Sequence, residues 1–194
     1  MPEPGLIHYY FGTGKGKTTA SLGLALRMLG HGGRVASYHF MKSSNRYGEF
    51  RGAAGFDDSW SLVLAGPPCV NPGAVEPDFI CEGCMACHVA PGNPKPEDIE
   101  AAEKGLAGAA GILEAGNADL VILDEVGYAV ELGLLDVSAV LEAVKTRATG
   151  VEVVLTGGRS RNSEFAALAD YVTEMVEQTH HYKTGRIEVE GIDF

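Results

Sequence analysis

The chain has 194 residues, enough for one α/β domain with a core of its own. Its 15 Lys and Arg residues against 26 Asp and Glu residues give a net charge of −11, which excludes the broad positive surface that non-specific nucleic-acid binding needs. No apolar run approaches the roughly 20 residues of a membrane span, and the N-terminus lacks a secretory signal pattern, so we expect a cytoplasmic protein.

Strand and helix patterns alternate along the chain. We predict strands at residues 5–11, 34–41, 61–65, 118–123, 151–155 and 171–175, with an edge strand at 186–194. Helices are predicted at residues 18–29, 95–115, 136–146 and 163–169, and residues 43–58 should form a loop with some helix. Such units imply a single α/β domain over residues 1–194, with a mainly parallel sheet covered by helices on both faces.

The first strand runs into FGTGKGKTT at residues 11–19, and an amphipathic helix follows. Strand, Gly-rich turn and helix form the context of a phosphate-binding loop, although a phenylalanine replaces the first Gly of the usual G-x-x-x-x-G-K-S/T pattern. Lys17 would supply a charge for phosphate oxygens and Thr18 a hydroxyl for Mg²⁺. The candidate nucleotide contacts in the loop are Gly12, Thr13, Gly14, Lys15, Gly16, Lys17, Thr18 and Thr19. An ordinary Gly- and Lys-rich turn stays open as the alternative.

A second nucleotide feature is LVILDE at residues 120–125. The apolar run delivers Asp124 to the carboxyl edge of a buried strand, where it could hold Mg²⁺ or its water opposite Thr18. Glu125 beside it could orient a water or the substrate. The alternative is a buried strand whose terminal acids cap the next turn. Together with the loop, this feature favours a P-loop NTPase-like fold.

Residues 66–96 contain all four cysteines and most of the prolines, with no helix or strand period. A loop this long is uncommon unless it is functional or tied down. Cys81, Cys84 and Cys87 have the close triple spacing that binds a 4Fe–4S cluster, and Cys69 could be the fourth ligand. Zinc is the alternative metal, and four free thiols are a further alternative. His88 is more simply a solvated loop side chain than a ligand. We interpret residues 66–96 as a metal-binding insertion.

Taken together, these segments resemble the P-loop ATP:corrinoid adenosyltransferases, also called cob(I)alamin adenosyltransferases. The matching pieces are GTGKGKTTA (12–20), HFMK (39–42) with Gly48-Glu49, LDEVGYAVELGLL (123–135), LTGGR (155–159), ADYVTEM (169–175) and GIDF (191–194). The resemblance implies that a cob(I) corrinoid attacks the 5′ carbon of ATP and that triphosphate is released. It also implies that the protein is a homodimer. Complete cobalamin and an earlier corrinoid such as cobyrinic acid a,c-diamide both stay open as substrates.

The resemblance also implies roles for single residues. Lys17 and Asp124, the latter through Mg²⁺, would stabilise the departing triphosphate, with Glu125 as a third catalytic residue. Further nucleotide or metal-side contacts are expected from Lys42, Glu49 and Arg159, with solvated loop charges as the alternative for the last two. Tyr128 would face the corrin. The segment His180-His181-Tyr182 is interpreted as packing near the nucleotide or the sheet edge.

Two departures from the family pattern stand out. LTGGR has one Gly more than the usual LTGR, which leaves the offset of Arg159 open. The aromatic segment that helps to strip the lower axial ligand from cobalt is replaced by residues 66–96. One hypothesis is that a cluster in this segment relays an electron to cobalt from a flavoprotein or ferredoxin, and a purely structural cluster is the alternative. The alternative function is a P-loop ATPase that acts as a switch or metal-cluster carrier and releases ADP and phosphate.

Overall fold

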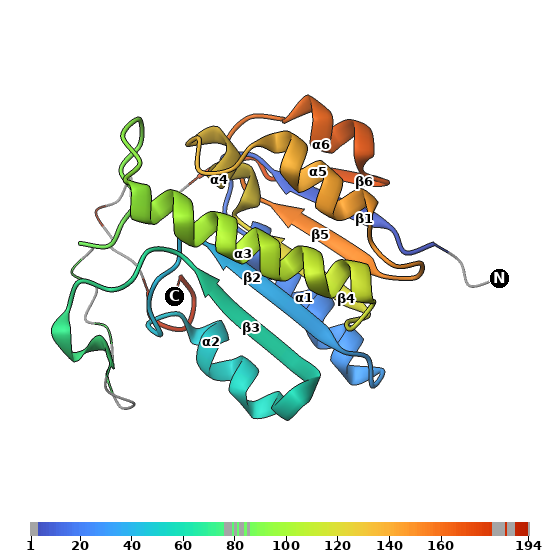
Figure 1. Cartoon of the computed structure of the whole chain (residues 1–194), viewed down its shortest axis with the longest axis horizontal. Helices are drawn as coiled ribbons and strands as arrows, with labels where there is room; N and C mark the ends of the chain where they lie inside the picture. Colours follow the sequence, from blue (N-terminus) through green and yellow to red (C-terminus); the bar gives the residue numbers. More distant parts are fainter. Residues whose placement is uncertain are drawn as a thin grey trace.

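The computed structural model describes residues 4–75, 79, 81, 84, 86–179, 185 and 189–193. Within this part of the chain, six parallel strands form one sheet in the order β3-β2-β4-β5-β1-β6 (Figure 1). The strands are β1 (Ile7–Phe11), β2 (Val35–Phe40), β3 (Trp60–Ala65), β4 (Leu120–Asp124), β5 (Glu152–Thr156) and β6 (Tyr171–Glu174). The predicted α/β fold with a mainly parallel sheet is confirmed.

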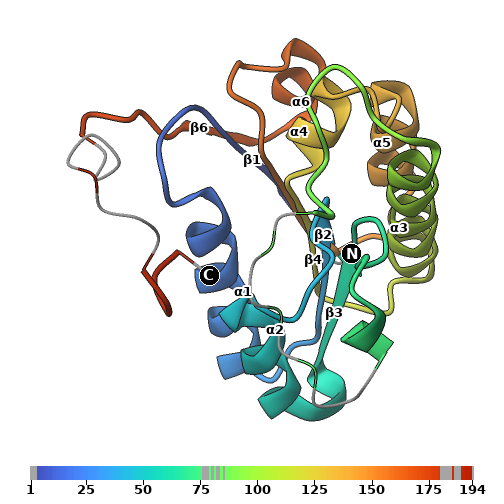
Figure 2. The same cartoon turned by 90° about the vertical axis from the view of Figure 1, so that its left-hand side faces the viewer.

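Helices cover both faces of the sheet (Figure 2). They are α1 (Lys17–Gly30), α2 (Gly48–Ala53), α3 (Pro96–Ala115), α4 (Val126–Glu131), α5 (Val137–Lys145) and α6 (Ser163–Leu168), with 3₁₀ turns η1 (Ala54–Ser59) and η2 (Pro72–Val75). In Figure 2, α1 and α2 lie on one face, and α3, α5 and α6 lie on the other. Two apolar cores result, a larger one on the α3 and α5 side and a smaller one under α1.

The pleat of the strands decides which side chains meet α1. In β4, Val121 and Leu123 belong to the larger core, whereas Ile122 belongs to the core under α1. Because side chains alternate along a strand, Asp124 lies on the same face as Ile122. The same alternation places His39 of β2 and Thr156 of β5 on that face. Three polar side chains thus gather at the carboxyl ends of neighbouring strands, on the side where α1 lies.

The ends of the predicted helices are set by local capping. Helix α3 begins at Pro96, and the Asp98 carboxylate accepts a hydrogen bond from Lys95 N at 2.8 Å. It ends at Gly116, which has a φ of 64°. Helix α5 is preceded by Asp136, whose side chain accepts a hydrogen bond from the backbone N–H two residues later, at 2.8 Å. These residues explain why the predicted ends agree with the structure.

The predicted C-terminal edge strand is wrong for the residues that the structure describes. Residues 189–193 form a turn in which Ile192 and Asp193 donate their N–H groups to Val189 O at 3.1 and 2.8 Å. The polar carboxylate of Asp193 also accepts from Val189 N at 2.7 Å, which closes the turn. His180, His181, Tyr182 and Phe194 lie outside the described residues.

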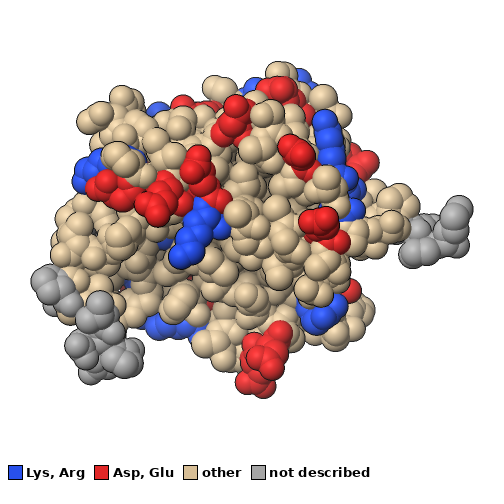
Figure 3. All heavy atoms as spheres, in the orientation of Figure 1, with Lys and Arg blue, Asp and Glu red and all other residues tan. Residues whose placement is uncertain are grey.

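Other sequence predictions concern the chain as a whole. The single domain over residues 1–194 and the insertion at 66–96 stay predictions. No helix in the described ranges is both long and apolar enough to cross a membrane. On the face drawn in Figure 3, acidic and basic side chains are interspersed and no continuous basic patch is visible.

Candidate active site

The loop between β1 and α1 packs directly against the chain after β6. Gly14 donates its N–H to Met175 O at 2.6 Å, and Gly12 donates to Gly158 O at 2.9 Å. A Cβ at Gly14 would lie 2.8 Å from the Met175 backbone. Gly12 and Gly16 have φ angles of 109° and 115°, a region that side chains penalise. Close backbone approach and left-handed conformations therefore require the glycines of this loop.

The loop curls around the ammonium group of Lys17, the first residue of α1. Lys17 Nζ donates to the carbonyl oxygens of Gly12 at 2.8 Å and Gly14 at 3.0 Å. The first N–H groups of α1 have no partner within the helix, and the helix dipole is positive at this end. An anion bound here would meet both the lysine charge and these N–H groups.

The other polar loop residues lie further out. Thr13 is exposed, and its Oγ1 accepts from Glu177 N at 3.4 Å. Lys15 forms an ion pair with Asp193 of the C-terminal turn, and both residues line the same cavity. Thr19 is exposed and also lines it. The C-terminal turn therefore lies beside the loop rather than at a sheet edge.

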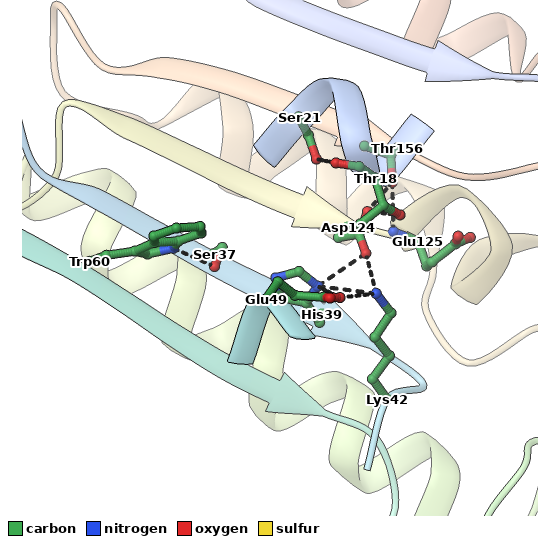
Figure 4. Close-up of polar contacts among 10 residues, drawn as sticks. All are labelled: Thr18, Ser21, Ser37, His39, Lys42, Glu49, Trp60, Asp124, Glu125 and Thr156. Atoms are coloured by element: carbon green, nitrogen blue, oxygen red, sulfur yellow. Dashed lines mark hydrogen bonds and ion pairs between the residues drawn. The ribbon is translucent and has the colours of Figure 1, made fainter. Parts of the chain in front are cut away.

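The carboxylate of Asp124 is fully buried and accepts hydrogen bonds from two hydroxyl groups (Figure 4). Thr18 Oγ1 donates to Asp124 Oδ1 at 2.9 Å, and Thr156 Oγ1 donates to the same oxygen at 2.7 Å. Carboxylate and hydroxyl oxygens are the hard ligands that Mg²⁺ prefers. The contact between Thr18 and Asp124, beside the phosphate loop, fits a Mg²⁺ ion.

The second oxygen of Asp124 lies beside a lysine. Lys42 Nζ donates to Asp124 Oδ2 at 3.1 Å and to Glu49 Oε1 at 2.8 Å, and His39 Nδ1 lies 3.1 Å from Asp124 Oδ2 (Figure 4). Burial alone would raise the pKa of Asp124, but the Lys42 ammonium and His39 hold it well below its usual range. Burial would lower the pKa of Lys42, but Asp124 and Glu49 raise it above its ordinary value. The four side chains form one polar network, in which Asp124 and His39 are fully buried and Lys42 and Glu49 are half-buried.

Glu125 has an unusual backbone conformation, with a φ of 61°. Its N–H donates to Thr156 Oγ1 at 2.9 Å, and its buried Oε2 has no hydrogen-bond partner among the described residues. Burial, and after it the negative charge of Asp124, raise the pKa of Glu125 to about 7. A left-handed residue whose carboxyl group lines a cavity is a candidate functional position.

The additional glycine before Arg159 connects β5 to the phosphate loop. Gly157 and Gly158 have φ angles of 99° and 91°, and Gly158 O is the acceptor for the N–H of Gly12. Arg159 still reaches the cavity, where its Nε donates to Tyr128 Oη at 3.1 Å. This hydrogen bond raises the pKa of Arg159 above its ordinary value. The additional residue therefore does not remove Arg159 from the site.

One cavity of about 940 Å³ joins these groups. The phosphate loop forms one wall, and Lys42, Glu49, Glu125, Tyr128 and Arg159 also face it. An aromatic wall is formed by Tyr47, Phe56 and Trp60; the rings of Phe56 and Trp60 are 5.7 Å apart, and the Tyr47 ring lies 4.7 Å from Lys42 Nζ. Trp60 is fixed by its Nε1, which donates to Ser37 Oγ at 3.0 Å. The volume lies near the upper end of the roughly 300–1,000 Å³ typical of ligand sites.

Among its described residues, the cysteine segment contributes to the cavity wall through residues that follow the last cysteine. His88, Val89 and Pro91 line the cavity, although His88 is also exposed to solvent. Cys69, Cys81 and Cys87 are half-buried and Cys84 is exposed. Among the residues described, no three His, Cys, Asp or Glu side chains are arranged to hold a metal ion. The iron–sulfur or zinc centre therefore stays a prediction from the cysteine spacing.

The structure brings most of the predicted site residues together around one cavity. Those that line it are Lys15, Gly16, Lys17, Thr18, Thr19, Lys42, Glu49, Glu125 and Arg159, with Asp124 buried behind Thr18. Sequence reasoning missed the roles of His39 and Thr156 as partners of Asp124, and the aromatic wall at Tyr47, Phe56 and Trp60. The alternation of side chains along the predicted strands could have indicated His39 and Thr156, because each lies an even number of residues after an apolar residue on the face that packs against α1.

A Gly-rich loop surrounds Lys17 at the start of a helix, and the buried Asp124 accepts a hydrogen bond from Thr18, the next residue. This arrangement defines a P-loop nucleotide-binding protein. The sequence model of the family described as ATP:corrinoid adenosyltransferase BtuR/CobO/CobP matches residues 3–194. The chain therefore belongs to this family.

Named relatives agree with the family match. A corrinoid adenosyltransferase of Pseudomonas aeruginosa is 30% identical over 192 residues, which cover 99% of this chain and 85% of the relative. One from Escherichia coli is 29% identical over 192 residues, with 99% and 87% covered. Corrinoid adenosyltransferase CobA of Salmonella typhimurium is 28% identical over 199 residues, again with 99% and 87% covered.

Proposed function

We propose that the protein transfers the 5′-deoxyadenosyl group of ATP to the cobalt of a reduced cob(I) corrinoid and releases triphosphate, in the synthesis or salvage of adenosylcobalamin. Family membership and the names of the relatives support this activity. The structural observation in its favour is one cavity that is lined both by the phosphate-binding loop and by aromatic side chains. Such a cavity offers polar groups for the triphosphate and apolar groups for the corrin ring.

The triphosphate would bind where Lys17 and the start of α1 present positive charge. In the part of the chain that the structure describes, Lys17 Nζ is held by backbone carbonyls, which a phosphate oxygen can replace without leaving a buried charge unpaired. Bound Mg²⁺, held by Thr18 and Asp124, would supply additional positive charge near the phosphates. Lys42 and Arg159 are the further cations that face the cavity from outside the loop.

The reaction requires little proton transfer by the protein. Cob(I) is itself a strong nucleophile, so no general base is needed, and the leaving group is a polyanion. Positioning and stabilisation of the leaving group are then the main catalytic contributions. We assign Lys17 and Asp124 to the triphosphate side, and Glu125 to the orientation of substrate at the junction with the corrin. Tyr47, Phe56 and Trp60 would contact the corrin ring.

Finer assignments follow from the resemblance and the sequence. We propose a cytoplasmic homodimer that accepts electrons from a flavoprotein or a ferredoxin. We also propose that Cys69, Cys81, Cys84 and Cys87 hold a metal centre, with an iron–sulfur cluster favoured over zinc because of the triple spacing. Cobalamin and cobyrinic acid a,c-diamide are both proposed substrates, to be compared directly.

Analysis of the products tests this function. The protein is incubated anaerobically with Mg²⁺, ATP and chemically reduced cob(I)alamin or cob(I)yrinic acid a,c-diamide. We expect a light-sensitive alkylcobalt product and triphosphate in equal amounts. Formation of ADP and phosphate without alkylcobalt would instead identify the P-loop ATPase alternative.

The variant that tests the proposed triphosphate site is Lys17→Ala. We expect it to slow adenosyl transfer by about 10²–10³-fold, the range found when one charge-stabilising group is removed from an active site. Lys104→Ala is the control, because Lys104 is exposed on α3, on the other face of the sheet. Full activity of Lys17→Ala with supplied cob(I) corrinoid would contradict the proposed site.

A further inference from the structure

The hydrogen-bond partners of the Asp124 carboxylate fall into two groups. Thr18 and Lys42 line the cavity, so a bound nucleotide or metal ion can reach them. Thr156 and His39 are fully buried at the ends of β5 and β2. In Figure 4, Thr156 lies on one side of the carboxylate and His39 on the other. The two buried residues can therefore hold Asp124 while ligands exchange at the other two.

The hydroxyl group of Thr156 is both a donor and an acceptor. Its Oγ1 donates to Asp124 Oδ1 at 2.7 Å and accepts from Glu125 N at 2.9 Å (Figure 4). An ionised carboxylate only accepts and an N–H only donates, so the direction of both hydrogen bonds is fixed. One buried hydroxyl thus connects the side chain of the predicted Mg²⁺ ligand to the backbone of the next residue.

The hydrogen bond to the N–H of Glu125 supports a backbone conformation that side chains disfavour. Glu125 has a φ of 61°, in the left-handed region. The chain after β5 packs closely against it, because a Cβ at Gly157 would lie 2.9 Å from Glu125 Cα. In this conformation Glu125 lines the cavity. Thr156 and the glycine after it therefore help to fix the place from which the Glu125 side chain extends.

Strand β5 holds Thr156 between the two parts of the site. It lies between β4, which carries the predicted Mg²⁺ ligand, and β1, which leads into the phosphate loop. Thr156 pairs with Tyr10 of β1, and Gly157 donates its N–H to Tyr10 O at 3.0 Å. Gly158 O then accepts from Gly12 N in the phosphate loop at 2.9 Å. Backbone contacts on the β1 side therefore fix Thr156 relative to this loop.

We propose that Thr156 is a positioning residue for adenosyl transfer. Its hydroxyl holds the Asp124 carboxylate beside Thr18 and keeps the Glu125 backbone in the conformation that lines the cavity. Because Thr156 is itself fully buried, it acts through Asp124 and Glu125. The inference rests on the proposed function. Residues that orient a metal ligand in this way typically contribute about 10–100-fold to metal affinity or activity.

The first test is the Mg²⁺ dependence of ATP binding, measured by calorimetry with and without Mg²⁺. Thr156→Val removes the hydroxyl and keeps the branched shape, whereas Thr156→Ser keeps the hydroxyl. We expect Thr156→Val to lose most of the gain in ATP affinity that Mg²⁺ provides, about tenfold. Thr156→Ser should keep this gain. An unchanged Mg²⁺ dependence in Thr156→Val would overturn the inference.

Hydrogen exchange of the ligand-free protein tests the contact to Glu125 without metal or substrate. The exchange rate of the Glu125 amide is compared with that of Ile122 in the middle of β4, which reports on the stability of the whole sheet. In Thr156→Val the Glu125 amide should exchange about tenfold faster relative to Ile122, because it has lost its acceptor. Equal acceleration of both amides would show a merely structural role and would overturn the inference.

Kinetics separate binding from positioning. With saturating Mg²⁺ATP and supplied cob(I)alamin, Thr156→Val should lower kcat about tenfold, because saturation does not restore the orientation of Asp124 and Glu125. Thr146→Val is the control: its hydroxyl donates to Glu142 O at the end of α5, on the other face of the sheet, and kcat should not change. An unchanged kcat in Thr156→Val would overturn the inference. No alkylcobalt from the unaltered protein would instead count against the proposed function, and calorimetry and hydrogen exchange would still test Thr156.

A second pair of variants covers the case in which Thr156→Val does not fold. Thr156→Ala and Thr156→Ser both lack the methyl group of threonine and differ from each other only in the hydroxyl. We expect Thr156→Ala to show the losses in Mg²⁺ dependence, amide protection and kcat, and Thr156→Ser to avoid them. Equal behaviour of the two variants would show that the hydroxyl does not position the site.

Discussion

Replacement of Lys42 by Met tests whether the buried network at Asp124 is balanced by this lysine. Lys42 Nζ is 3.1 Å from Asp124 Oδ2 and 2.8 Å from Glu49 Oε1. The side chain of Asp124 is 0% exposed and that of Lys42 13%. Methionine keeps the length of the side chain but removes its charge, so the Asp124 carboxylate would lose the nearest ammonium group.

The expected loss of stability follows from the burial of the pair. Removing one partner of a buried ion pair typically costs about 3–5 kcal/mol, because the other charge is left uncompensated. Asp124 keeps its contacts to the two threonine hydroxyls and to His39, which favours the lower end, about 3 kcal/mol. For a chain of this length, that corresponds to a decrease in melting temperature of about 6–12 °C.

The measurement is thermal and urea unfolding of the ligand-free protein, with a double-mutant cycle. Lys42→Met with Asp124→Asn should recover at least half of the loss, because position 124 then carries no uncompensated charge, while Glu49, the other partner of Lys42, keeps some contact with solvent. Lys15→Met is the control: its partner Asp193 is half-buried, but Lys15 itself is 41% exposed, so solvent screens this pair and the change should be below about 1 kcal/mol. A loss below about 1 kcal/mol for Lys42→Met, or a double variant that merely sums the single losses, would refute this reasoning.

Two further substitutions address the phosphate loop and the metal site. Gly14→Ala should weaken ATP binding at least tenfold, because the new Cβ would lie 2.8 Å from the Met175 backbone and displace the loop. Calorimetry measures the affinity. The control is Gly23→Ala, which should bind ATP normally because nothing lies within 4 Å of the new Cβ. Thr18→Val should remove most of the gain in ATP affinity that Mg²⁺ provides, about tenfold or about 1.4 kcal/mol, because the hydroxyl beside Asp124 is lost. The control for Thr18→Val is Thr173→Val, on the exposed strand β6. If the ATP affinity of Thr18→Val depended on Mg²⁺ as in the unaltered protein, Thr18 would be excluded as a Mg²⁺ ligand.

The sequence predicted the parts of the site that depend on local patterns. The Gly-rich loop and Lys17 follow one strand and begin one helix, so their relation is fixed within about 20 residues. Asp124 was also predictable, because four apolar residues before it mark a buried strand. Both features depend on short stretches of chain, where spacing alone determines geometry.

Other parts depend on contacts between distant strands. His39 and Thr156 contact Asp124 only because β4 lies between β2 and β5, an order that the sequence does not specify. The aromatic wall was missed for a similar reason. Trp60 begins β3 while Tyr47 precedes α2, and only the fold brings them to one cavity. Residues 186–194 were predicted as an edge strand, yet in the described residues 189–193 the Asp193 carboxylate accepts a hydrogen bond from Val189 N and closes a turn.

In the ligand-free site, the ammonium groups of both lysines already have hydrogen-bond partners. Lys17 is held by carbonyl oxygens of the loop, and Lys42 is held by Asp124 and Glu49. Phosphate oxygens can replace the loop carbonyls at Lys17, and a Mg²⁺ ion at Asp124 can replace the ammonium of Lys42. A phosphate would bring negative charge to Lys17 in place of neutral carbonyls, and Mg²⁺ would bring positive charge to Asp124 in place of the Lys42 ammonium, so neither Lys17 nor Asp124 would be left unpaired. Lys42, still paired with Glu49, would then be released from Asp124 toward the phosphates, so metal binding would be coupled to completion of the cation set around the triphosphate.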